Sequence, residues 1–193
     1  MNSRAMGKLL AITVAICGAL SAAAPVKFDL ADTTGSRHTA DEWRGKKAVV
    51  LFFTMTDCPL ANGYVPEMNR LRAAYEPQGV AFYAVQVDNT ASDAAVKKYA
   101  QEFAYTFPML NDPRLTLARL TGAKVTPEVA VLSSSGEVLY LGRIDNKVED
   151  LTHPRYAATE PELRNALDAV LAGRAPKEAK TRAVGCSINL ESK

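Results

Sequence analysis

The sequence predicts an α/β fold in which a central mixed β-sheet is flanked by helices. Short apolar runs alternate with amphipathic segments in the order strand, helix, strand, helix, hairpin, helix. The first two strands, joined by a helix, predict a parallel pair, and the hairpin predicts an antiparallel pair. A length of 193 residues suits one domain. We therefore expect one sheet with helices on both of its faces.

Residues 1–24 have the composition of a secretory signal peptide. Arg4 and Lys8 make the start positive, an apolar run follows at residues 9–20, and small residues suited to cleavage come next. The apolar run is shorter than the roughly 20 residues that a membrane-spanning helix needs. We expect an exported protein, periplasmic or extracellular, without a stable membrane span after cleavage. The alternatives are an uncleaved anchor and a lipid attached at Cys17.

The domain, expected over residues 25–173, begins with short and partly exposed elements. Val26 to Leu30 alternates apolar and polar residues, which indicates an edge strand. Asp41 to Gly45 predicts a single helical turn ended by glycine. Its Trp43 is expected to pack over the sheet.

A buried strand runs directly into a helix at the centre of the chain. Val49 to Phe53 is β-branched and aromatic, which is typical of a strand buried on both faces. Cys58 falls at the junction, near the N-terminus of the helix, where backbone N–H groups and the helix dipole stabilise an anion. The position predicts a reactive thiol with a lowered pKa, and the alternative is a small buried hydrophobic cysteine. The helix is predicted from apolar residues at spacings of three and four, namely Val65, Met68, Leu71 and Tyr75.

The elements after this helix carry clear start and stop signals. Val80 to Val87 predicts the second strand, and Ser92 predicts the cap of the next helix. Asp112-Pro113 predicts the start of a further short helix, with proline at its first position and Gly122 just past its end.

A hairpin and a last helix complete the predicted domain. Val129 to Leu132 and Val138 to Leu141 are apolar runs separated by a tight turn, which predicts an antiparallel hairpin. Thr159 and Glu162 predict a capping box at the start of the last helix. That helix is expected to bury an apolar face that reaches Leu171.

The composition is that of an ordinary globular protein, with 48% hydrophobic and 23% charged residues. The net charge is only +2, and the Lys and Arg residues are scattered. A nucleic-acid-binding protein would carry clustered basic residues. We therefore expect no nucleic-acid partner.

Two cysteines remain after removal of the signal peptide, Cys58 and Cys186. Export implies a compartment in which disulfides persist. Residues 174–193 form a C-terminal tail, basic and expected to be flexible at first, then apolar around Cys186. The two cysteines can pair only if the fold brings them together, or transiently, within one chain or between chains.

Three motifs occur together at the expected points of one known fold. Residues 52–58 join the buried strand to the helix, Pro66 lies inside that helix, and Thr126-Pro127 precedes an apolar strand. With these motifs, residues 26–171 resemble the thioredoxin-like superfamily, near its exported TlpA-like and redoxin (AhpC/TSA) members. The resemblance implies a thioredoxin-like fold and a thiol-disulfide oxidoreductase that needs no metal or organic cofactor. It also implies a cis bond before Pro127.

On this resemblance Cys58 matches the attacking cysteine of a CxxC pair, but the second cysteine position holds Ala61. Release of the mixed disulfide then falls to a distant cysteine, to a partner's thiol, or to no group. Cys186 is the candidate resolving thiol, on a tail that resembles the C-terminal arm of two-cysteine peroxiredoxins. The alternatives for Cys186 are an anchoring patch and a permanent structural disulfide.

The resemblance implies further site residues and partners. The substrate is expected to be a thiol or disulfide protein or a small oxidant, with an external thiol as electron donor. Independently of the resemblance, Arg143 and Asp145 are a candidate ion pair near the edge of the site. The predicted substrate groove consists of Pro59, Thr126 and Pro127, and the predicted supporting residues are Thr54, Thr56, Asn62 and Arg143.

A thiol peroxidase, an antioxidant enzyme, is the second hypothesis. Peroxiredoxins orient peroxide with a threonine and a proline, and the matching positions here hold Met55 and Leu51. The peroxide pocket is therefore not evident. Thr54 and Thr56 are the candidates to replace that threonine.

A copper carrier or assembly factor without turnover, similar to Sco proteins, is the third hypothesis. Soft thiolates favour Cu(I). Such a site would have to combine Cys58, Cys186 and His153, and a surface-loop role for His153 is the alternative. We expect no metal site.

Overall fold

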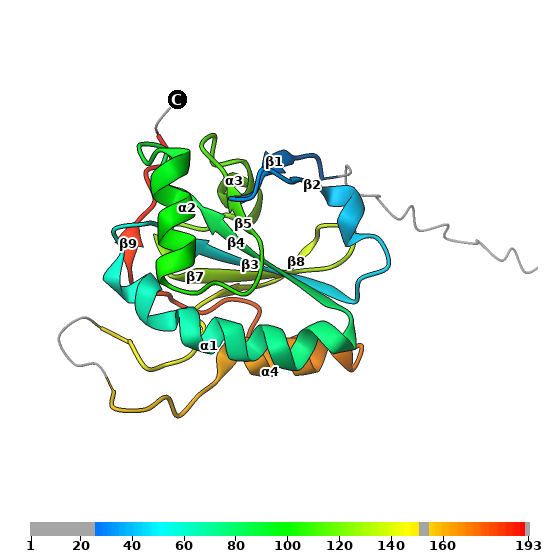
Figure 1. Cartoon of the computed structure of the whole chain (residues 1–193). Coiled ribbons are helices and arrows are strands. Elements are labelled where there is room, and N and C mark those ends of the chain that lie inside the picture. Colours follow the sequence, from blue (N-terminus) through cyan, green and yellow to red (C-terminus); the bar gives the residue numbers. More distant parts are fainter. Residues whose placement is uncertain (1–25, 151–154, 192–193) are drawn as a thin grey trace, which may run out of the picture.

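A mixed five-stranded sheet forms the centre of the computed structural model, which describes residues 26–150 and 155–191 (Figure 1). The strand order is β5-β4-β3-β7-β8. β3, β4 and β5 are parallel, and β7 is antiparallel to both β3 and β8. The predicted parallel pair and the predicted hairpin are therefore confirmed. The strands are β3 (Ala48–Thr54), β4 (Val80–Gln86), β5 (Met109–Asn111), β7 (Glu128–Leu132) and β8 (Val138–Gly142).

The predicted signal peptide, Cys17 and His153 lie outside the described residues. Across the two described ranges, none of the helices combines the length and the apolar character that crossing a membrane requires.

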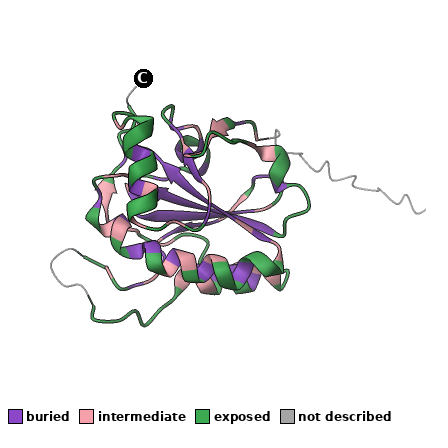
Figure 2. Cartoon of the chain, in the orientation of Figure 1, coloured by how far each residue is buried: buried purple, intermediate pink, exposed green. Residues whose placement is uncertain are grey.

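β3 lies at the middle of the sheet, and all of its residues are buried. Its side chains alternate between the two faces, as they do in any strand. Val50 and Phe52 join one hydrophobic cluster, and Leu51 and Phe53 join the other. Figure 2 shows the central strands buried, with exposed residues on the outer surfaces of the helices. The apolar run at residues 49–53 is thus explained by burial on both faces.

Helices cover both faces of the sheet, as the sequence predicts. α1 and α4 lie side by side on one face, whereas α3 and the 3-10 helix η1 pack in the opposite cluster (Figure 1). α2 packs in the cluster of α1 and α4 through Val96 and Tyr99. The helices are α1 (Pro59–Tyr75), α2 (Asp93–Glu102), α3 (Thr116–Thr121), α4 (Glu162–Leu171), η1 (Ala40–Trp43) and η2 (Glu76–Gln78).

The N-terminal strand is shifted from its predicted place. β1 (Asp29–Ala31) pairs with β2 (Arg37–Thr39) in a separate two-stranded sheet. Phe28 precedes this strand and packs on Trp43, with ring centroids 5.1 Å apart. Trp43 is buried, as predicted. The strand therefore starts at Asp29, where pairing with Thr39 begins, and not at Val26.

The predicted start of the third helix at Asp112-Pro113 is wrong, because α3 begins at Thr116. Asp112, four residues before the first residue of α3, instead caps the N-terminus of this helix. Its buried carboxylate accepts hydrogen bonds from the backbone N–H groups of Thr116 and Leu117, both at 2.8 Å. The strand β5 just before it was not predicted, since three residues give no recognisable alternation.

The predicted capping box of the last helix is also wrong. The N-cap position of α4 is Pro161, and no side chain caps the helix. Thr159 is bonded to Asn146: its Oγ1 accepts from Nδ2, and its backbone N–H donates to Oδ1, both at 2.8 Å. Asn146 is itself buried and satisfies its amide in this way.

The start of the C-terminal tail, expected to be flexible, lies along the edge strand β8. The backbone N–H of Leu141 donates to the carbonyl of Ala179 (3.0 Å), and the N–H of Thr181 donates to the carbonyl of Leu141 (3.1 Å). The unpaired backbone groups of an edge strand are available for such pairing. The tail is thereby directed toward the end of the sheet where α1 begins.

Candidate active site

Cys58 is the N-cap residue of α1, as the sequence predicts. Its backbone N–H donates to the carbonyl of Met55 in a tight turn (3.2 Å), and its carbonyl accepts from the N–H of Asn62 (3.1 Å). Pro59 follows at the first helical position, where its missing N–H costs nothing. The side chain of Cys58 is fully buried.

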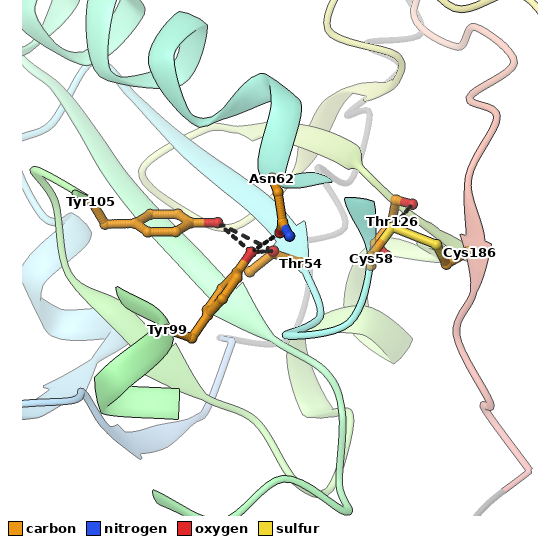
Figure 3. The surroundings of a disulfide bond; sticks show 7 residues. All are labelled: Thr54, Cys58, Asn62, Tyr99, Tyr105, Thr126 and Cys186. Carbon is orange, nitrogen blue, oxygen red and sulfur yellow. Dashed lines mark hydrogen bonds between the residues drawn. A yellow bond between two sulfur atoms is a disulfide. The ribbon is translucent and has the colours of Figure 1, made fainter. Parts of the chain in front are cut away.

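Cys58 forms a disulfide with Cys186 of the same chain, across 128 positions of sequence (Figure 3). The two Cα atoms lie 6.2 Å apart. Cys186 lies on β9 (Cys186–Ser187) and is half-buried. The course of the tail along β8 therefore delivers the candidate resolving thiol to the N-terminus of α1.

β9 pairs antiparallel with β6 (Val125–Thr126), the short strand that precedes Pro127. In this register Cys186 faces Thr126. The Sγ of Cys58 lies 3.0 Å from the carbonyl oxygen of Thr126. The Thr126–Pro127 peptide bond is cis, as the resemblance implies. Cys58, Cys186, Thr126 and Pro127 are thus brought together.

Glu128 fixes the segment that precedes β6, a role that the sequence analysis missed. Its buried carboxylate accepts a hydrogen bond from the backbone N–H of Lys124 (2.8 Å). The sequence did contain a signal for this role, an acidic residue at the start of a strongly apolar strand. A carboxylate buried there must accept hydrogen bonds from nearby donors. Thr126 is also buried, and its Oγ1 has no hydrogen-bond partner among the described residues.

A cluster of hydroxyl groups connects the first turn of α1 to β3 and α2 (Figure 3). The OH of Tyr99 donates to Oδ1 of Asn62 (2.7 Å) and lies 2.8 Å from Oγ1 of Thr54. The OH of Tyr105 lies 3.1 Å from that of Tyr99 and 3.2 Å from Oγ1 of Thr54. Burial raises the pKa of both tyrosines, so both remain neutral donors. The sequence analysis named Thr54 and Asn62 but not the tyrosines.

The family model for AhpC/TSA proteins matches residues 21–141, which is more than half of the chain. The chain belongs to the AhpC/TSA family. The match includes β3, Cys58, α1 and the cis Pro127. It ends within β8, so the tail that carries Cys186 lies beyond the matched residues.

Curated relatives of this AhpC/TSA chain are named thiol-disulfide oxidoreductase ResA. The protein from Geobacillus thermodenitrificans is 32% identical over 111 residues, which cover 58% of this chain and 62% of that protein. The protein from Halalkalibacterium halodurans is 27% identical over 128 residues, which cover 65% of this chain and 71% of that protein. The chain thus spans less than two thirds of the length of the first of these relatives.

Solved structures share the thioredoxin-like fold. An uncharacterized conserved protein from Geobacillus kaustophilus has a TM-score of 0.74 and 28% identity, covering 89% of this chain and 93% of that chain. A secreted disulfide oxidoreductase from Mycobacterium tuberculosis has a TM-score of 0.54 and 19% identity, covering 77% and 96%. At that identity the second likeness shows the fold alone.

The remaining predicted site residues of this AhpC/TSA chain are Pro59, which follows Cys58 directly, and Thr56 and Arg143. Pro59 is exposed and lines a cleft of about 520 Å³ beside α1. The Oγ1 of Thr56 donates to a carboxylate oxygen of Asp88 at 3.5 Å. Arg143 donates to Glu162 at the start of α4 (2.6 Å).

The predicted ion pair between Arg143 and Asp145 is wrong. Arg143 pairs with glutamates, whereas Asp145 accepts a hydrogen bond from the OH of Tyr64 (2.7 Å). Glu162 reaches the guanidinium because the start of α4 lies next to the end of β8, where the backbone N–H of Leu163 donates to the carbonyl of Ile144 (3.0 Å). In the part of the chain that the structure describes, no group of three or more His, Cys, Asp or Glu residues could hold a metal ion.

Proposed function

We propose that the chain is an exported thiol-disulfide oxidoreductase in which Cys58 is the nucleophile and Cys186 the resolving thiol. The observation that carries the proposal is the disulfide between them at the N-terminus of α1. The names of the ResA relatives support this class of reaction. The composition of residues 1–24 supports export to the periplasm or beyond.

The reaction is a pair of thiol-disulfide exchanges. The Cys58 thiolate attacks one sulfur of a substrate disulfide, and the other substrate sulfur leaves as a thiolate. The Cys186 thiolate then attacks Sγ of Cys58, and the second substrate thiolate leaves. Two electrons have passed to the substrate, and the Cys58–Cys186 disulfide remains for an external thiol donor to reduce. These steps require no metal or organic cofactor.

Ala61 makes the distant cysteine necessary. It occupies the second position of the CxxC pattern on α1 and is fully buried. A methyl group cannot attack the mixed disulfide, so resolution needs another thiol. Cys186 is the cysteine that the fold places against Cys58.

The other residues named from the sequence have supporting roles in this proposal. Thr126 and Pro127 form the edge along which an extended substrate lies, and Pro59 borders it on the α1 side. Thr54 and Asn62 hold the first turn of α1 in place through Tyr99. Thr56 and Arg143 act more remotely, through their bonds to Asp88 and to the start of α4.

No contact among the described residues specifically favours the thiol peroxidase or the copper carrier. Thr54, the candidate to orient a peroxide, bonds to Tyr99 and Tyr105. Thr56 bonds weakly to Asp88. Peroxide consumption is the readout that separates a peroxidase from a thiol-disulfide oxidoreductase.

Reduction of insulin by the purified protein, with dithiothreitol as donor, tests the proposal. Cys58→Ser abolishes turnover, and Cys186→Ser accumulates a mixed disulfide between Cys58 and the substrate. Ser187→Ala is the matched control, because Ser187 is an exposed neighbour of Cys186 and should react at the normal rate. Unchanged insulin reduction by Cys58→Ser would refute the assignment, and Cys58-dependent peroxide consumption without insulin reduction would replace it with a peroxidase.

A further inference from the structure

Residues 185–188, here called the tail segment, occupy the backbone edge next to Cys58. Cys186 and Ser187 pair with Thr126 and Val125 as an antiparallel strand. The pairing continues where the backbone N–H of Ile188 donates to the carbonyl of Lys124 (2.9 Å). The tail segment therefore lies along the same edge that the proposed function assigns to an extended substrate.

The tail segment is shaped to fit this edge. A Cβ atom at Gly185 would lie 2.0 Å from the carbonyl oxygen of Thr126 and 2.6 Å from its carbonyl carbon. These are backbone atoms that cannot rotate away, so only glycine allows this close approach. On the other side of Cys186, Ile188 is buried in the hydrophobic cluster that contains Leu117 and Ala123.

The two cysteines of the disulfide are not equally exposed. Cys58 is fully buried, whereas Cys186 is half-buried on a two-residue strand. An attacking thiolate has to reach the sulfur with which it bonds, so access favours Cys186.

The choice of leaving group favours the same direction. If Cys186 is attacked, Cys58 leaves as a thiolate at the N-terminus of α1. Unpaired backbone N–H groups and the helix dipole stabilise an anion there. A better-stabilised thiolate leaves faster.

We propose that an external reductant attacks Cys186, an inference that rests on the proposed function. Until this attack, the tail segment covers the backbone edge of Thr126 and Pro127 along which the substrate would lie. A donor thiolate bonds to Sγ of Cys186, the Cys58–Cys186 bond breaks, and its electron pair leaves on Sγ of Cys58. The donor's second thiolate attacks the donor sulfur of the mixed disulfide, which releases the Cys186 thiolate and leaves an oxidised donor. A dithiol donor completes both exchanges within one complex.

Reduction then opens the edge. Without the disulfide, the tail segment is held by one short strand pairing and by the burial of Ile188. Ordering several residues for so few contacts is unfavourable. The edge and Cys58 become available to a partner that presents an extended polypeptide with a disulfide.

Glutathione, a monothiol, identifies the sulfur that is attacked. The oxidised protein is mixed with glutathione, quenched with acid at successive early times and mapped by mass spectrometry. We expect glutathione on Cys186 with Cys58 free. Glutathione on Cys58 with Cys186 free would overturn the proposed direction and leave the proposed function intact. A protein that never forms the Cys58–Cys186 bond would overturn both.

Gly185→Ala tests the fit of the tail segment to the edge. We expect the disulfide of this variant to be reduced at about tenfold lower glutathione concentration, because the added methyl group displaces the segment. Gly63→Ala is the matched control, since a Cβ there meets open space. Equal reduction of Gly185→Ala and Gly63→Ala would contradict the fit.

Hydrogen exchange tests the opening of the edge directly. We expect the amide of Ile188 to exchange about tenfold faster or more after reduction, because its bond to Lys124 is then lost most of the time. Unchanged protection of this amide in the reduced protein would show that the edge stays closed.

Discussion

The hydroxyl group of Tyr99 connects α2 to the first turn of α1. It donates to Asn62 and lies within hydrogen-bonding distance of Thr54. We predict that Tyr99→Phe lowers the free energy of unfolding by about 1–2 kcal/mol, because the buried Thr54 and the half-buried Asn62 each lose a hydrogen-bond partner. Urea unfolding followed by circular dichroism measures the loss.

Tyr156→Phe is the control for this prediction, since Tyr156 is fully exposed. Its hydroxyl group is solvated in the folded and the unfolded chain, so its removal should leave the stability unchanged. An equal effect of the two substitutions would mean that the buried hydroxyl cluster contributes nothing.

His38 introduces a dependence of stability on pH. Its Nδ1 lies 2.8 Å from Oε2 of Glu42, and its Nε2 lies 3.2 Å from Oδ2 of Asp32. Partial burial opposes protonation, but the hydrogen bonds to Glu42 and Asp32 outweigh it and raise the pKa of His38. The stabilisation is therefore complete below the ordinary pKa of about 6.5 and is lost as pH rises through the raised value.

We predict that the difference in unfolding free energy between the wild type and His38→Gln shrinks as pH rises from about 6 to about 9. The difference is measured by urea unfolding at each pH, so that groups common to both proteins cancel. A difference that stays constant across this range would contradict the assignment.

At the residue scale, the position of Cys58 at the start of α1 could be predicted because two local patterns meet there. An apolar strand and a helical periodicity define the junction, and neither depends on distant contacts. Tyr99 and Glu128 could not be placed in the same way. Their roles depend on which backbone or hydroxyl group lies opposite, and that is decided by packing between elements distant in sequence.

At the scale of elements, the close approach of the tail to β8 requires glycine at position 142, where Thr181 packs against the backbone. A Cβ at Gly142 would lie 2.1 Å from Oγ1 of Thr181 and 2.7 Å from its carbonyl oxygen. We predict that Gly142→Ala detaches residues 179–181 and lowers the free energy of unfolding by about 1–3 kcal/mol. Faster cleavage of the tail by trypsin, compared with Gly63→Ala, reports the detachment. Identical cleavage of the two variants would contradict it.

Long elements could be predicted from the sequence, and short or backbone-held ones could not. β3 and β4 are continuous apolar runs because both of their faces are buried. The tail was expected to be flexible because Arg174, Lys177 and Arg182 make it polar. Its contact with β8 is made by backbone hydrogen bonds and by the hydroxyl of Thr181, which lies 2.7 Å from the OH of Tyr140. Composition carries no information about such pairing.

At the scale of the whole molecule, the disulfide connects the C-terminal tail to the start of α1 over 128 positions. Such a cross-link restricts the unfolded chain. We predict that reduction lowers the free energy of unfolding by about 3–5 kcal/mol. Urea unfolding with and without dithiothreitol measures this, and Cys186→Ser should match the reduced wild type. Equal stability of the oxidised and reduced proteins would contradict the prediction.

The fold as a whole could be predicted because its signals are local and agree with one another. The Cys58–Cys186 pair could only be stated as an open alternative. Its formation requires the tail to run along β8 and then along β6, and no short-range pattern encodes that path.

The central claim is that Cys58 and Cys186 form a reversible redox pair. Equilibration of the purified protein in glutathione buffers of graded redox poise, followed by acid quenching, alkylation and mass spectrometry, tests it most directly. The account predicts one transition in which both thiols appear together and which retraces itself on reoxidation. A disulfide that persists under fully reducing buffer in the folded protein, or two cysteines that never join under oxidising buffer, would contradict it.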